Sequence, residues 1–157
     1  MSESRKNTLI VLCGLPASGK STFAEMLEES GFKVVCPDRV RKLLYGNESI
    51  QGNGKDVFRY AFESMILYGG ELNKDVVFDA TNTTKKARKK ILELARPHFD
   101  FILCYHFNVH PLICLKRNEG RERVVPEEVI CRMAKQFQEP STEEGFDYVC
   151  QIGNYYY

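Results

Sequence analysis

Short apolar runs recur along the chain and are separated by longer segments in which apolar residues have helical spacing. Because a strand that is covered on both faces has continuous rather than alternating hydrophobicity, each run predicts a buried strand. The expected strands are Thr8 to Cys13, Lys33 to Cys36, Asp75 to Asp79 and Asp100 to Phe107.

The segments between and after these strands are expected to be helical. In the longest of them, Phe58, Ala61, Phe62 and Met65 fall on one helical face. The polar stretch Gly46 to Gly54 is expected to be a loop, and the tail to Tyr157 predicts no element. The expected helices are about Lys20 to Ser30, Asp38 to Tyr45, Lys55 to Leu72, Thr83 to Arg96, Pro111 to Asn118 and Pro126 to about Gln138.

The alternation of strands and helices predicts an α/β fold, a parallel sheet of about four strands with helices on both faces. We expect residues 1–157 to form a single domain, because the chain has 157 residues and no Pro- or Ser-rich linker. Ligands of such sheets bind beyond the carboxyl ends of the strands, so polar residues at those ends are the candidates for function.

Composition narrows the class of protein without identifying it. The chain is 43% hydrophobic and 27% charged, and its net charge of +1 argues neither for nor against a nucleic-acid partner. No apolar run approaches the ~20 residues that cross a bilayer, so no membrane association is expected. The six cysteines lack C-x-x-C spacing and several lie in apolar runs. We interpret them as reduced, mostly buried thiols of a cytoplasmic protein.

A phosphate-binding motif follows the first expected strand. The segment Gly14 to Ser21 fits G-x-x-x-x-G-K-[ST] in full, in the required context of strand, glycine-rich turn and helix. Backbone N–H groups of such a turn and the helix N-terminus bind phosphate oxygens. We expect Lys20 to reach the β- and γ-phosphates of ATP and the Ser21 hydroxyl to ligate Mg²⁺. The expected ATP-binding residues of the motif are Gly14, Ala17, Ser18, Gly19, Lys20, Ser21 and Thr22.

The rest of the sequence favours a kinase over other nucleotide-binding proteins. The chain has no N-K-x-D sequence for guanine recognition and lacks the length of a motor ATPase. Asp38 comes directly after the second expected strand, where a carboxylate can orient an acceptor hydroxyl and accept its proton. An N-cap of the following helix is the alternative role for Asp38. Arg41 lies three residues on and can grip an acceptor phosphate, unless it is simply a solvated arginine.

Asp79 ends the third expected strand and has two candidate roles. A carboxylate at this place can position Mg²⁺ or its waters. It can equally anchor Arg41 through an ion pair. Thr81 and Asn82 follow it along the same edge. The sequence leaves the two roles of Asp79 open.

Two basic clusters remain. Arg117 and Arg121 are four residues apart between the last two expected helices, and one helical turn would aim both toward the triphosphate as a lid. A solvated charged loop, supported by Glu119 and Glu122, is the alternative. The cluster Lys85 to Lys90 suggests contact with a nucleic-acid backbone, but a solvated helix face is the favoured interpretation, because the charges surround the helix.

Taken together, GLPASGKST, the pair Asp38 and Arg41, the segment Phe78 to Asn82 (FDATN) and the segment Lys116 to Met133 resemble the kinase module of bacteriophage-type polynucleotide 5′-kinases. The resemblance runs from about Leu9 to Phe146. It implies that Lys20 and Ser21 handle ATP and Mg²⁺, and that Asp38 is the general base on a 5′-hydroxyl. It also implies that Arg41, supported by Asp79, holds the 3′-phosphate of the acceptor. Arg121 would be the lid arginine on the transferring phosphates, with Arg117 as its helper.

The sequence departs from that family in two respects. It contains no D-x-D-x-T motif, so no 3′-phosphatase activity is expected. The lid is one residue shorter, so the sequence does not decide between Arg121 and Arg123 as the arginine on the phosphates. Two alternatives stay open: a kinase for another hydroxyl, on a nucleoside, a sugar or a modified base in DNA, and an NTPase that transfers to nothing. DNA against RNA and the oligomeric state are also open.

Overall fold

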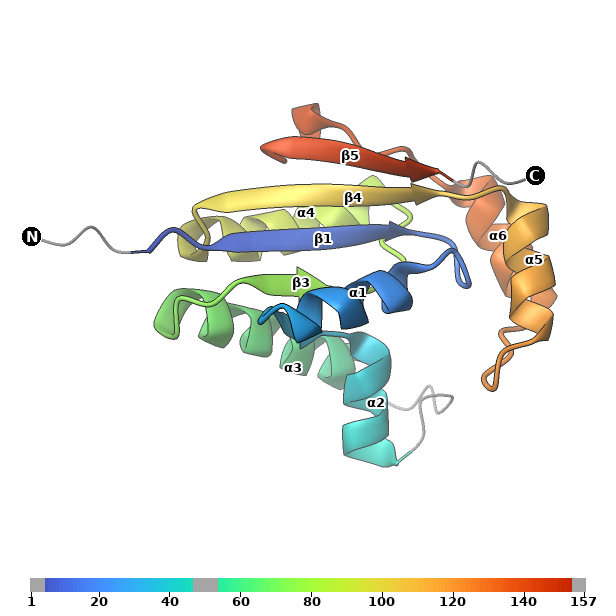
Figure 1. The fold of residues 1–157 in the computed structure, drawn as a ribbon, viewed down its shortest axis with the longest axis horizontal. Coiled ribbons are helices and arrows are strands. Elements are labelled where there is room, and N and C mark those ends of the chain that lie inside the picture. Colours follow the sequence, from blue (N-terminus) through green and yellow to red (C-terminus); the bar gives the residue numbers. More distant parts are fainter. Residues whose placement is uncertain (1–4, 47–53, 154–157) are drawn as a thin grey trace, which may run out of the picture.

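The structure is a computed structural model that describes residues 5–46 and 54–153. Within these residues the chain forms a sheet of five strands, all parallel, in the order β2-β3-β1-β4-β5 (Figure 1). The α/β architecture with a parallel sheet is therefore confirmed. The strands are β1 (Thr8–Gly14), β2 (Lys33–Val35), β3 (Val76–Phe78), β4 (Phe101–Asn108) and β5 (Tyr148–Gly153).

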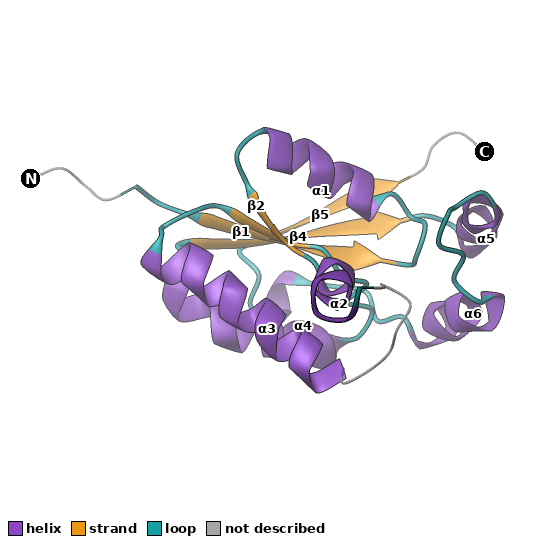
Figure 2. Ribbon diagram, turned by 90° about the horizontal axis from the view of Figure 1, so that it is seen from below, coloured by secondary structure: helices purple, strands orange, loops and turns teal. Residues whose placement is uncertain are grey.

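The helices cover both faces of the sheet, as the sequence predicts. Helix α1 lies on one face and α3 and α4 lie on the other, while α5 and α6 stand beyond the carboxyl ends of the strands (Figure 2). A π-helical turn, Leu67–Glu71, extends α3, and a 3-10 turn, Arg96–His98, follows α4. The helices are α1 (Lys20–Glu29), α2 (Pro37–Tyr45), α3 (Gly54–Ile66), α4 (Lys85–Ala95), α5 (Pro111–Glu119) and α6 (Glu127–Gln136).

The fifth strand, β5, lies in the tail where the sequence pattern predicts no element. It pairs in parallel with β4, with Leu103 opposite Tyr148 and Asn108 opposite Gly153. As an edge strand with one neighbour, it contains exposed and half-buried residues but no buried one, and it has no long apolar run. The signal that marks a buried strand is therefore missing from its sequence. Most of the polar loop predicted from Gly46 to Gly54 lies outside the described residues.

Strand β1 connects the two layers of the core. Leu9, Val11 and Cys13 pack in the cluster under α3 and α4, whereas Ile10 and Leu12 pack in the cluster under α1. Every one of these side chains is buried, which explains the continuous apolar run. Because β1 is the central strand, its carboxyl end places the phosphate-binding motif at the middle of the sheet edge.

Two local expectations need correction. Asp38 does not cap α2: the N-cap is Cys36 and Asp38 is the second residue of the helix, since Pro37 already has the fixed φ of a first helical position. Arg88 is not part of a solvated face: it is fully buried, whereas its four lysine neighbours are exposed. Its guanidinium pairs with Glu144 at 2.9 Å and donates to the carbonyl of Asn82 at 2.8 Å.

The cysteines match the expectation of reduced thiols. All six lie in the described residues and are unpaired, and four of them are buried. None of the helices in the described part of the chain is long and apolar enough to cross a membrane.

Candidate active site

The phosphate-binding turn connects β1 to α1 and places Lys20 at the first position of that helix. Gly14 is required by packing: a Cβ there would lie 2.8 Å from Oγ of Ser18 and 3.0 Å from the backbone oxygen of Phe107. Ala17 and Gly19 have left-handed backbone conformations, with φ of 65° and 106°. These conformations let successive N–H groups turn toward one concave site, as phosphate binding requires.

Lys20 is folded back over this turn. Its ammonium group donates to the carbonyl of Leu15 at 2.7 Å and lies 3.4 Å from the hydroxyl of Ser18. Burial lowers the pKa of Lys20, and the nearby charge of Asp79 opposes that effect. A buried ammonium group with few partners is well suited to phosphate oxygens, which would replace the neutral carbonyl with an anionic acceptor.

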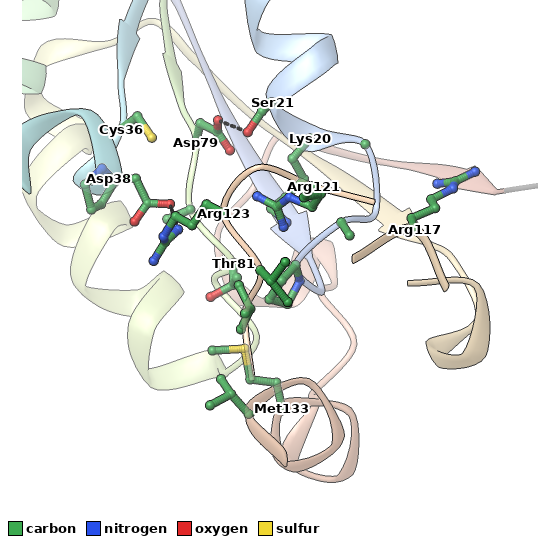
Figure 3. Close-up of a pocket in the computed structure, with 18 of the residues that line it drawn as sticks. Lys20, Ser21, Cys36, Asp38, Asp79, Thr81, Arg117, Arg121, Arg123 and Met133 are labelled. Atoms are coloured by element: carbon green, nitrogen blue, oxygen red, sulfur yellow. Dashed lines mark hydrogen bonds and ion pairs between the residues drawn. The ribbon is translucent and has the colours of Figure 1, made fainter. Parts of the chain in front are cut away.

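Ser21 and Asp79 form the second part of the site. The hydroxyl of Ser21 donates to Oδ2 of Asp79 at 3.1 Å, as the dashed line in Figure 3 shows. Burial raises the pKa of Asp79, while Lys20 and the hydrogen bond from Ser21 lower it. A hydroxyl beside a carboxylate at a phosphate site is the donor set that Mg²⁺ takes in P-loop enzymes, with the other ligands supplied by phosphates and water. Consistently, the described residues contain no cluster of three or more His, Cys, Asp or Glu side chains that would hold a metal by itself.

The structure separates Asp79 from Arg41. Among the described residues, Arg41 forms its ion pair with Asp38, at 2.7 Å. No ion pair of Asp79 is seen in this part of the chain. The anchoring of Arg41 by Asp79 is therefore not seen among the described residues.

Asp38 lies between two guanidinium groups. Its Oδ1 accepts from Arg41 at 2.7 Å and its Oδ2 accepts from Arg123 at 2.9 Å. Arg41 belongs to α2, the same helix as Asp38, whereas Arg123 reaches over from the segment between α5 and α6 (Figure 3). The sequence analysis named Arg123 only as an alternative to Arg121, because an ion pair across 85 residues leaves no pattern in the chain.

The segment from Gly120 to Val124, here called the lid, is closed at its base by Asn118. The buried amide of Asn118 donates to the carbonyl of Val125 at 2.7 Å, and its oxygen accepts from the Val125 N–H at 3.0 Å. Asn118 was not among the expected site residues. These two bonds fix both ends of the lid and leave the residues between them to project over the phosphate-binding turn.

The lid arginines do not share one helical turn as expected, because α5 ends at Glu119. Figure 3 shows Arg121 beside Lys20 and Arg117 on the other side of the phosphate-binding turn. One terminal nitrogen of Arg121, Nη1, is buried without a hydrogen-bond partner in the structure. An unpaired buried guanidinium N–H is costly, so this group is poised for an anion such as a phosphate.

A third contact network joins the turn after β3 to the phosphate-binding turn. The Gly14 N–H donates to the carbonyl of Thr81 at 2.9 Å, and the Asn82 amide donates to the carbonyl of Leu12 at 2.7 Å. The buried guanidinium of Arg88 donates a hydrogen bond to the carbonyl of Asn82. The residues at this edge are therefore fixed by one continuous set of hydrogen bonds.

The phosphate-binding turn, Asp38, Asp79 and the lid arginines line one cavity of about 1140 Å³. Its wall carries an excess of positive charge, with six cationic side chains and two carboxylates, although the whole chain has a net charge of only +1. The lining also contains apolar side chains, among them Val124, Val129 and Met133. The cationic and acidic residues of the wall are Lys20, Arg41, Arg117, Arg121, Arg123, Arg132, Asp38 and Asp79.

A comparison with protein families assigns most of the chain to one family. A family model described as an AAA domain (AAA_33) matches residues 9–140. The chain belongs to this family of AAA domains. The matched relatives are kinases, so this AAA domain is a P-loop domain of the kind found in kinases, a family that uses ATP.

Relatives of this AAA domain act as kinases. It is 28% identical over 156 residues to the bifunctional polynucleotide phosphatase/kinase of Schizosaccharomyces pombe, a match that covers 96% of the chain and 34% of that protein. It is 26% identical over 147 residues to the L-seryl-tRNA(Sec) kinase of Methanococcus maripaludis, covering 88% of the chain and 56% of that protein.

A solved structure shows the same fold. A chain of the Pnkp1/Rnl/Hen1 RNA repair complex superimposes on this AAA domain with a TM-score of 0.77 and 23% identity, covering 92% of this chain and 48% of that chain. The AAA domain therefore spans between about a third and about half of the length of these relatives.

Proposed function

We propose that the protein transfers the γ-phosphate of ATP to the 5′-hydroxyl end of a polynucleotide. The observation that carries the proposal is the position of Asp38. This carboxylate lines the same cavity as Lys20 and the Ser21–Asp79 pair, and Arg41 holds it from the adjacent helical turn. A hydroxyl bound beside Asp38 would thus face the terminal phosphate of a nucleotide bound at the phosphate-binding turn.

The proposed mechanism assigns one task to each side chain. The backbone of Gly14 to Thr22 and the ammonium group of Lys20 bind the phosphates of ATP. Ser21 and Asp79 would hold Mg²⁺, which neutralises charge on the β- and γ-phosphates. Asp38 accepts the proton of the 5′-hydroxyl as the 5′-oxygen bonds to the γ-phosphorus and ADP leaves.

The lid acts on the charge that develops during transfer. Arg121 lies beside Lys20, and its unpaired Nη1 would donate to the oxygens of the transferring phosphate. Arg117 would assist from the other side of the phosphate-binding turn. Among the described residues the ion-pair partners of Asp38 are Arg41 and Arg123, so neither Arg117 nor Arg121 is tied to the proposed base.

Three features support a polynucleotide acceptor. The cavity wall has four more cationic than acidic side chains, enough for the triphosphate and for further phosphates of the acceptor. Arg41 borders the hydroxyl position and offers a planar guanidinium for a 3′-phosphate. Finally, the relative in Schizosaccharomyces pombe is itself a polynucleotide phosphatase/kinase, matched over 96% of this chain.

The second candidate is a kinase for another hydroxyl, for example on a nucleoside, a sugar or a modified base in DNA. The similarity to the L-seryl-tRNA(Sec) kinase of Methanococcus maripaludis favours this candidate, because the name of that relative gives a different acceptor. The two candidates share the ATP side of the cavity and differ only in the acceptor.

The experiment is a transfer assay with Mg²⁺ and γ-labelled ATP. The acceptors are a 5′-hydroxyl oligonucleotide, the same oligonucleotide with a 5′-phosphate, a nucleoside 3′-monophosphate and a free nucleoside. We expect label on the first and third acceptors only. Label on the 5′-phosphorylated oligonucleotide would place the acceptor at an internal group, and label on the free nucleoside would favour the second candidate. ATP binding without transfer to any of them would refute the proposal.

A further inference from the structure

The two arginines that hold Asp38 differ in how they can move. Arg41 is three residues away on the same helix, so it moves together with Asp38. Arg123 lies on the lid, whose hydrogen bonds at the base join Asn118 to Val125 and the N–H groups of Gly120 and Arg121 to the end of α5. Among these contacts, the one from Arg123 to Oδ2 of Asp38 can therefore open while α2 stays intact.

Oδ2 is also the oxygen that an acceptor needs. A general base must lie within about 2.6–3.2 Å of the hydroxyl that it deprotonates. In the structure Oδ1 is taken by Arg41 at 2.7 Å and Oδ2 by Arg123 at 2.9 Å. Since Asp38 is partly exposed at 38%, any small hydroxyl compound that enters the cavity, water included, competes with Arg123 for Oδ2.

We propose that Arg123 determines which hydroxyl compound Asp38 activates. In the absence of an acceptor, Arg123 occupies Oδ2 and keeps Asp38 from activating water. The acceptor hydroxyl, held in place by its own phosphate contacts, displaces Arg123 and takes its position. The inference rests on the proposed function, because it takes Asp38 as the general base. The suppression of water activation by Arg123, however, does not depend on the identity of the acceptor.

The suppressed side reaction is hydrolysis of ATP. A water oxygen bonds to the γ-phosphorus, the bond from that phosphorus to the β–γ bridging oxygen breaks, and the proton of the water goes to Asp38. The products are ADP and inorganic phosphate. Transfer follows the same course with the 5′-oxygen in place of the water oxygen, so the two reactions compete for the same carboxylate.

The lid carries two arginines that lie on different sides of the cavity. Arg121, two residues before it, lies beside Lys20 on the ATP side, while Arg123 lies on the acceptor side (Figure 3). A short segment with both ends fixed thus carries one arginine to each substrate.

The test uses the full chain with Mg²⁺ and ATP and measures phosphate release without acceptor, then KM for a 5′-hydroxyl oligonucleotide. The variants are Arg123→Gln, Arg123→Lys, Asp38→Asn and the double variant Arg123→Gln/Asp38→Asn. Lys116→Gln is the matched control, because it removes one positive charge from exposed α5, where Lys116 pairs only with Glu119 at 3.3 Å.

We expect Arg123→Gln to raise phosphate release about tenfold, a part of the 10²–10⁴-fold that a general base supplies, and to lower KM for the acceptor. Arg123→Lys keeps a cation on Oδ2 and should stay close to the unaltered protein, as should Lys116→Gln. The double variant should release phosphate no faster than Asp38→Asn alone.

Phosphate release that does not rise in Arg123→Gln would overturn the inference. So would a rise that persists in the double variant, because it would not pass through Asp38. If the unaltered protein fails to label the oligonucleotide while Arg123→Gln still raises release through Asp38, the proposed acceptor is wrong and the role of Arg123 stands.

Discussion

Ser21 and Asp79 lie 58 residues apart in the chain and meet at 3.1 Å through the hydrogen bond from the Ser21 hydroxyl to Oδ2 of Asp79. The contact joins the start of α1 to the end of β3. Burial raises the pKa of Asp79, and Lys20 provides the main opposing charge. The carboxylate is thus placed where an added cation would relieve an unfavourable burial.

Replacing Asp79 with Asn should weaken the use of Mg²⁺ more than the binding of nucleotide. We expect the Mg²⁺ concentration for half-maximal activity to rise about 10–100-fold, because the pair with Ser21 loses its anionic ligand. A Mg²⁺ titration of phosphate transfer measures this, and EDTA should abolish transfer. Asp75→Asn, at the other end of β3, is the control and should leave the titration unchanged. An unchanged titration for Asp79→Asn would exclude the Mg²⁺ role.

Replacing Asp38 with Asn should stop transfer while ATP still binds. The amide keeps the shape of the side chain but cannot accept the hydroxyl proton, so we expect transfer to fall by more than ~10²-fold. Single-turnover transfer and equilibrium ATP binding separate the two effects. Full ATP turnover in this variant would instead support an NTPase that transfers to nothing.

Arg41 should affect the acceptor and not the nucleotide. Charge-assisted hydrogen bonds are worth about 1.5–3 kcal/mol, so Arg41→Ala should raise KM for a nucleoside 3′-monophosphate roughly 10–150-fold. KM for ATP should stay within about twofold. Arg39→Ala is the matched control, since Arg39 lies on the same helix and pairs with Glu28 at 2.7 Å, away from the cavity. An equal change for both variants would argue against a specific contact of Arg41 with the acceptor.

Arg88 should be important for stability, although it lies outside the cavity. Arg88→Ala removes the buried ion-pair partner of Glu144 and one of the two donors to the carbonyl of Asn82, and we expect the free energy of unfolding to fall by about 3–5 kcal/mol. Arg96→Ala breaks the exposed pair with Asp147 and should cost no more than about 1 kcal/mol. Urea denaturation of both variants tests the difference. Equal losses would show that the buried pair has no special role.

The sequence predicts the fold and the strand, turn and helix around the phosphate-binding motif well, because these depend on local patterns. The run from Thr8 to Cys13 and the motif from Gly14 to Ser21 combine apolar continuity, glycine spacing and one lysine, and all of them are neighbours in the chain. The sequence also predicts that Asp38 and Asp79 lie at the same edge of the sheet, since the carboxyl ends of parallel strands meet there.

The remaining contacts depend on which distant segments meet. The partner of Arg123 is 85 residues away, and the partner of Arg88 lies in a 3-10 turn after the last helix. Helical spacing suggested that Arg117 and Arg121 act together, but Gly120 ends the helix between them. Such pairings are set by the packing of α4, the lid and the C-terminal segment, and no local pattern in the chain specifies them.

The contact between Arg88 and Glu144 has a consequence for where the domain can be cut. The family match ends at residue 140, and every side chain assigned to ATP or to the acceptor hydroxyl lies before that point. A protein shortened there would nevertheless lose Glu144 and the strand beside β4, and with them the charge that keeps Arg88 beneath Asn82. A fragment that ends at residue 140 would therefore contain every proposed active-site residue but would lack the segment that keeps those residues in place.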